Sequence, residues 1–269
     1  MSSKGHPQLI LSHPYDLMPR LIVPTTMKVK STFSRFFVIC LLMICGTLFL
    51  PAQSKADHLR GVDDFFTTYV KDGRVDYASI QQNQAQLATL TDQMTELDFS
   101  AMEKDERLAI LINSYNLYVI AGVIEKYPVK SPLDISNFFD RKVYQLGNKT
   151  VSLNQIEKQL IIAEYQDARV HFALVCGALG CPSIRNEAYT PEAVDSQLDQ
   201  QTTQALNNPE FVRLSSGVLS VSQIFEWYSK DFGGSKASTL AYISSRSDLP
   251  IPADAKVKYY EYDWTLNDL

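Results

Sequence analysis

The chain has 269 residues, of which 45% are hydrophobic, so it is long and apolar enough to bury a core. Acidic residues outnumber basic ones by 30 to 25. A nucleic-acid-binding surface needs clustered lysines and arginines, so no nucleic-acid partner is expected. The sequence also has no glycine-rich phosphate loop, nucleophile-elbow serine or HExxH pair, and gives no support to P-loop, Rossmann, α/β-hydrolase or zincin chemistry. We expect neither a cofactor nor a metal ion.

The N-terminal region has the order of features of a secretory signal. Residues 36–50 form an uncharged apolar run, shorter than the about 20 residues of a membrane-spanning helix. Three basic residues precede this run: Lys28, Lys30 and Arg35. Two small residues follow it at the positions that a signal peptidase reads: Ser54 and Ala56. We therefore predict a cleavable signal peptide over 27–56, with an uncleaved membrane anchor as the alternative.

Cleavage after Ala56 would export residues 57–269 as one soluble domain, to the periplasm or outside the cell, without stable membrane insertion. Residues 1–26 show no helical or strand period, and we interpret them as an over-called extension before a start at Met27. Residues 1–56 hold six basic residues and one acidic residue. The exported part therefore keeps 19 basic and 29 acidic residues, a net charge of −10.

The exported part also has few reactive side chains. Of the four histidines in the chain only His58 and His171 remain, and of the four cysteines only Cys176 and Cys181. His58 lies two residues from the new N-terminus. Imidazole or thiol chemistry inside the domain must therefore involve residues 171–181.

The sequence predicts a mixed, helix-rich α+β domain with two hairpins and a buried central strand. About the first 45 residues of the exported part look helical, with a turn at 71–74. Ser100 and Glu103 form a capping-box pattern that opens a helix over about 101–126, which Pro128 ends. This helix is apolar nearly all round, so it should be buried.

The remaining elements follow from shorter patterns. Glycine-containing turns between β-like runs predict hairpins at 142–153 and 211–222. Residues 168–178 (ARVHFALVCGA) are apolar and β-branched without a helical period, which predicts a central strand buried on both faces. Helices are expected near 153–164, after Thr190, near 223–231 and near 236–245, and a last strand over 256–264.

Two amides interrupt the apolar helix at 101–126. Asn113 and Asn116 are spaced i,i+3 and share one face of a helix that otherwise has no polar side. A buried amide without partners costs about 1–3 kcal/mol, so both must form hydrogen bonds. One interpretation is that they clamp an irregular loop against the helix. The other is that they orient a catalytic group or bind a substrate.

His171, Cys176 and Cys181 form the second group of candidates. A Cys176–Cys181 disulfide would suit an exported protein and a short loop that contains glycine. A reactive thiol with His171 as its base is the second interpretation. On an unbroken strand, however, His171 and Cys176 would lie on opposite faces, about 16 Å apart. Inert thiols or a zinc site remain as further interpretations, but structural zinc needs four ligands and only three are visible.

Two further clusters have competing interpretations. Arg185 and Asn186 lie on the loop after the predicted central strand, where binding sites are often built, although a surface loop with local salt bridges is an equal alternative. The aromatic residues of 225–232 (FEWYSKDF) favour core packing over a binding surface.

Several of these segments together resemble an uncharacterised bacterial and plant family, domain-of-unknown-function family 547. The segments are ILINSYNLYVI (110–120), RVHFALVCGALGCPSIRNEAY (169–189), IFEWYSKDFG (224–233) and YDWTLN (262–267). The resemblance covers most of 60–267. It implies no activity and assigns no role to any residue, because none is established for the family.

Two hypotheses of different classes follow. In the first, the exported domain is a thiol-dependent hydrolase or acyltransferase. Cys176 or Cys181 is then the nucleophile and His171 the base, while Asn113 or Asn116 orients the imidazole or stabilises an oxyanion. In the second, the domain is a non-catalytic binding domain with a structural Cys176–Cys181 disulfide. Neither hypothesis specifies a small-molecule or protein partner.

Overall fold

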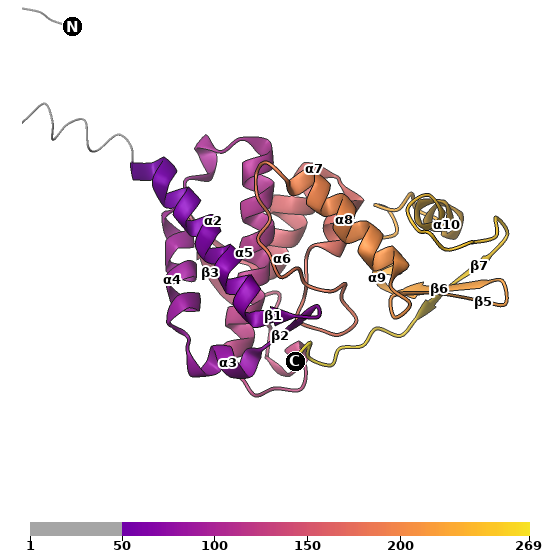
Figure 1. The fold of residues 1–269 in the computed structure, drawn as a ribbon, viewed down its shortest axis with the longest axis horizontal. Helices are drawn as coiled ribbons and strands as arrows, with labels where there is room; N and C mark the ends of the chain where they lie inside the picture. The colour runs from indigo at the N-terminus through magenta and orange to yellow at the C-terminus, as the bar shows by residue number, and fades with distance from the viewer. Residues whose placement is uncertain (1–49) are drawn as a thin grey trace, which may run out of the picture. The chain divides into compact units, whose positions relative to one another are not determined.

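The computed structural model describes residues 50–269. The predicted extension 1–26 and residues 27–49 of the predicted signal peptide lie outside the described residues. The predicted cleavage position after Ala56 falls within the first described helix, α2 (Leu50–Tyr69; Figure 1). Core side chains of this helix follow that position: Val62, Phe65 and Phe66.

Helices and small sheets alternate along the described chain, which confirms the predicted α+β class. The other α-helices are α3 (Tyr77–Gln82), α4 (Ala85–Gln93), α5 (Lys104–Ile124), α6 (Leu153–Gln155), α7 (Ala163–Tyr165), α8 (Val194–Asn207), α9 (Ile224–Trp227) and α10 (Lys236–Ser244). The strands are β1 (Val70–Lys71), β2 (Arg74–Val75), β3 (Val143–Leu146), β4 (Lys149–Ser152), β5 (Val212–Ser215), β6 (Val218–Ser222) and β7 (Lys256–Tyr260).

The sheets confirm both predicted hairpins, which are β3–β4 and β5–β6. The predicted last strand is β7, which pairs in parallel with β6. A parallel neighbour requires a crossover connection, and here α9 and α10 lie in it. The predicted turn at 71–74 is itself a hairpin, β1–β2, whose central residues Asp72 and Gly73 have φ of 51° and 75°. Positive φ at both central residues fits a tight hairpin turn.

Helix α5 is the buried helix that the sequence predicts, and it packs with α4, which in turn packs against α2 (Figure 1). Among residues 50–269 it is the one helix long and apolar enough to cross a membrane. However, 89% of its apolar window is buried inside the protein, as in a core helix. The predicted capping box at Ser100 is wrong. Asp98 binds both the backbone N–H and the hydroxyl of Ser100 and holds it in a 3₁₀ turn, so the helix begins later, after Glu103.

The buried side chains form two clusters. The first core cluster surrounds α5, and the second core cluster lies against the sheet β5–β6–β7. Helix α8 contributes Leu198 to the first cluster and Leu206 to the second. The segment after α7 contributes Val170 to the first cluster and Phe172 to the second. This segment therefore lies at the junction of the two clusters.

The prediction of a central strand at 168–178 is wrong, although the segment is buried. Residues Ala168–Phe172 form a 3₁₀ helix, and the rest of the segment belongs to no strand, although Ala178 forms an isolated antiparallel bridge with Leu266. The side chain of Asn116 takes the place of that strand: its Nδ2 donates to the carbonyl of Ala173 (3.0 Å), and its Oδ1 accepts from the N–H of Val175 (2.9 Å). An apolar run alone cannot distinguish a central strand from an irregular segment packed between two core clusters. Both are buried on two sides, so both consist of apolar residues.

Candidate functional site

A pocket of about 280 Å³ opens between the two core clusters. We call it the aromatic pocket, because six of its lining residues are aromatic: Tyr115, Phe139, Trp227, Tyr228, Tyr262 and Trp264. Its polar lining residues are Asp140, Asn154, Glu157 and His171, and Cys176 and Cys181 also line it. Its volume is close to the lower limit of about 300 Å³ for small-molecule sites, which are mostly apolar with a few convergent polar groups.

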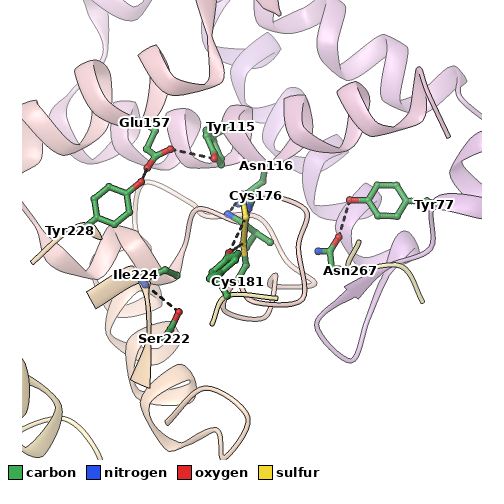
Figure 2. Close-up of a disulfide and its surroundings, with 12 residues drawn as sticks. Tyr77, Tyr115, Asn116, Glu157, Cys176, Cys181, Ser222, Ile224, Tyr228 and Asn267 are labelled. Carbon is green, nitrogen blue, oxygen red and sulfur yellow. Dashed lines mark hydrogen bonds between the residues drawn. A yellow bond between two sulfur atoms is a disulfide. The ribbon is translucent and has the colours of Figure 1, made fainter. Parts of the chain in front are cut away.

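Glu157 is the buried acid of the aromatic pocket, with 8% of its surface exposed. Tyr228 donates a short hydrogen bond to Oε1, and Tyr115 donates to Oε2 over 3.5 Å (Figure 2). Burial raises the pKa of the Glu157 carboxyl above its ordinary value near 4.5, although both hydrogen bonds and nearby Lys158 act in the opposite direction. A buried acid with a raised pKa in a cleft is typical of a functional site.

A π-helical segment positions Glu157. Ser152 and Gln155 form a capping box at which α6 begins, and residues Ile156–Ile162 continue as a π-helix before α7. Such segments are rare and occur frequently at functional sites. The sequence contains a signal for this residue: Glu157 is four residues from Leu153 and from Ile161, so an acid occupies the apolar face of the predicted helix.

His171 forms a hydrogen bond with Asp231: its Nε2 donates to Oδ2 of the carboxylate over 2.7 Å. The imidazole packs on the ring of Tyr228, with 4.1 Å between ring centroids. Burial lowers the pKa of His171 below its ordinary value of 6.5, and the Asp231 carboxylate only partly offsets this. The imidazole is therefore neutral near pH 7 and fixed by Asp231.

Cys176 and Cys181 are joined as a disulfide, with 6.5 Å between their Cα atoms (Figure 2). This Cα separation is within the usual range for disulfides. The hydroxyl of Tyr262 lies 2.9 Å from Sγ of Cys181 and 3.1 Å from Sγ of Cys176. Both cysteines are half-buried, so the disulfide forms part of the pocket wall.

The C-terminal residues hold the disulfide loop and complete the pocket. The N–H of Leu179 donates to the carbonyl of Thr265, and the N–H of Gly180 donates to the carbonyl of Asp263, each over 2.8 Å. This pairing places Tyr262 on the two sulfurs and Trp264 on the pocket wall. Nearby, Tyr77 and Asn267 form a buried hydrogen bond of 3.0 Å that fixes the end of the chain (Figure 2).

The comparison with protein families supports the resemblance seen in the sequence. The family model described as "Protein of unknown function, DUF547" matches residues 99–205. These residues are a DUF547 domain. The match includes Glu157, His171 and both cysteines, whereas the two tryptophans of the aromatic pocket lie beyond it. No curated protein and no solved structure matches the chain.

Within the DUF547 domain, Asn113 and Asn116 both clamp loop backbone to helix α5. Asn113 repeats the arrangement of Asn116: its Nδ2 donates to the carbonyl of Tyr189 (2.8 Å), and its Oδ1 accepts from the N–H of the same residue (2.9 Å). These contacts agree with the interpretation that the two amides clamp an irregular loop against the helix. Neither amide lines the aromatic pocket, but Asn116 fixes the segment that leads into Cys176.

Arg185 and Asn186 follow the disulfide loop in the sequence and line a separate polar hollow. Arg185 forms a short ion pair with Glu187 and donates to Oε1 of Gln200 over 3.3 Å. The backbone carbonyl of Asn186 accepts from the hydroxyl of Thr67. The structure thus brings His171, Cys176 and Cys181 together on the aromatic pocket but places Arg185 and Asn186 elsewhere.

The aromatic segment 225–232, just beyond the DUF547 match, divides between core and pocket. Phe225 and Phe232 are buried in the second core cluster, as core packing predicts. Trp227, in contrast, is 47% exposed at the aromatic pocket, and Tyr228 and Asp231 bind Glu157 and His171. Among the described residues, no group of three or more His, Cys, Asp or Glu side chains could hold a metal ion.

Proposed function

We propose that the exported part of the chain is a binding domain for a small ligand, with the aromatic pocket as its site. The observation that carries this proposal is the exposed Trp227 at an aromatic pocket that also holds the buried acid Glu157. An exposed tryptophan does not contribute the stabilisation that its burial would give. Tryptophan is also enriched where proteins contact ligands and partners.

The cysteine pairing favours a binding domain over a thiol-dependent enzyme. A disulfide sulfur has no thiolate with which to attack an acyl group. The hydrogen-bond partner of His171 among the described residues is Asp231 rather than a sulfur. The hypothesis of a Cys/His hydrolase would need the reduced form and a different orientation of the imidazole.

Tryptophan fluorescence tests the binding proposal directly, because the only two tryptophans of the chain, Trp227 and Trp264, both line the aromatic pocket. Titration with benzyl alcohol as a neutral aromatic probe should change the emission saturably, with a Kd in about the millimolar range for so small a ligand. In the variants Trp227→Phe and Trp264→Phe, the indole that remains should in each case still report saturable binding, since both rings line one site.

Denatured protein provides the control, because collisional quenching of exposed indoles does not saturate. Linear, unsaturable quenching in both the folded and the denatured protein would refute the binding proposal. A saturable response from one single-tryptophan variant but not from the other would show that the rings do not share a site.

We also propose that the domain is exported, with the disulfide formed after cleavage of the signal peptide. A short loop closed between two half-buried cysteines is the kind of bridge that persists in an oxidising compartment. Intact-mass analysis of protein from the envelope fraction should give a chain that begins at Asp57 and is lighter by two hydrogens before reduction than after it. A chain that still carries residues 36–50, or one whose mass does not change on reduction, would contradict the proposal.

A further inference from the structure

The charged groups that line the aromatic pocket are of one sign. Glu157 and Asp140 are acids, His171 is held neutral near pH 7 by its burial, and no lysine or arginine is among the lining residues. Lys158 follows Glu157 in the sequence but is exposed and does not line the pocket. The pocket therefore presents negative and neutral groups to a ligand, on a domain whose net charge is already negative.

The rings of the pocket wall form a group suited to cations. Trp227, Tyr262 and Trp264 lie with centroids 4.8–6.1 Å apart. The face of an aromatic ring attracts a cation within about 6 Å of its centroid, and tryptophan does so most strongly. Elsewhere in the described part of the chain, lysines and arginines lie over six tyrosine rings, but none lies over these three rings.

The hydrogen bonds of Glu157 suit an ionised carboxylate. Two tyrosine hydroxyls, from Tyr115 and Tyr228, approach different carboxylate oxygens, so each can donate to its own oxygen. A hydroxyl that donates to a carboxylate stabilises the charged form. A cation in the pocket would act in the same direction and would offset the cost of burying the charge.

From these observations we propose that the ligand of the aromatic pocket carries a positively charged amino or quaternary ammonium group, which binds against the tryptophan rings and is balanced by Glu157. The inference rests on the proposed binding function and specifies the chemical class of the ligand.

Three probes that share one ring separate the charge of the ligand from its shape: benzylammonium, benzyl alcohol and benzoate. Each is titrated against the tryptophan emission near pH 7. We expect benzylammonium to bind at least about tenfold more tightly than benzyl alcohol, and benzoate to bind most weakly. If benzyl alcohol binds as tightly as benzylammonium, the inference fails while the binding function stands. If none of the three binds saturably, the binding function itself fails.

Two matched variants assign the counter-charge. Glu157→Gln should remove most of the preference for benzylammonium and keep the affinity for benzyl alcohol, which also shows that the variant is folded. Glu226→Gln removes an equal charge from an exposed position beside Trp227 that does not line the pocket, and it should leave the preference unchanged. A preference that survives in Glu157→Gln would overturn the assignment of Glu157, and equal losses in both variants would indicate a nonspecific effect of net charge and overturn it as well.

Discussion

Replacement of Asn116 by leucine should destabilise the fold by about 2–6 kcal/mol, although it adds apolar surface to an apolar helix. The amide satisfies the carbonyl of Ala173 and the N–H of Val175, both in residues that are at most 3% exposed. Leucine is similar in size but leaves both backbone groups unpaired, and each buried, unpaired group costs about 1–3 kcal/mol. Urea denaturation near pH 7 measures the change.

Two comparisons make this test specific. Asn83→Leu, at an exposed helix end, should change the free energy of unfolding by no more than about 0.5 kcal/mol. Asn113→Leu should destabilise about as much as Asn116→Leu, but it releases Tyr189 and leaves the segment before Cys176 in place. It should therefore keep the affinity for benzyl alcohol. If Asn116→Leu is no more destabilising than Asn83→Leu, the Asn116 amide does not supply the hydrogen bonds that a neighbouring strand would otherwise provide.

The same amides mark the limit of prediction from the sequence. The local sequence identifies α5, the two hairpins and β7, because each contains its own signal: an apolar helical run, a glycine turn between β-like runs, or a β-like run. It fails at 168–178, since the backbone of Ala173 and Val175 bonds to a side chain distant in the sequence rather than to a strand. Asn113 and Asn116 on an apolar helix indicate that some distant backbone must bond to side-chain amides. The sequence does not show which backbone groups these are.

Some residues of the candidate site could be predicted from the sequence, and others could not. His171, Cys176 and Cys181 could be selected from the sequence because they are the only internal histidine and the only cysteines of the exported part. The acid and the rings around them come from separate elements: Glu157 from a π-helical segment, Trp227 from α9 and Trp264 from the C-terminal segment. Nothing in the local sequence links these three residues. Only the junction of the two core clusters brings them together.

Replacement of Glu157 by glutamine should stabilise the protein near pH 7 and leave its stability unchanged near pH 4. The pKa of this carboxyl is raised in the folded state, so below its ordinary value near 4.5 it is neutral in both states and contributes no difference. As the pH rises, the unfolded chain ionises first, and the folded protein loses stability until the pH passes the raised pKa. Each unit of the raised pKa corresponds to about 1.4 kcal/mol, and glutamine, which does not ionise, avoids this loss.

Urea denaturation of both proteins across this pH range gives the difference in stability. His171 contributes a slope of opposite sign: its pKa is lowered, so its contribution is present above 6.5 and is lost as the pH falls through the folded value. This contribution is common to both proteins and cancels in the difference. Glu226→Gln, exposed, should show no change at either pH. A difference that is the same near pH 4 and pH 7 would mean that Glu157 is not held with a raised pKa. A gain in stability near pH 7, combined with the loss of the preference for benzylammonium, would indicate that this carboxyl is kept at the cost of stability because it serves the site.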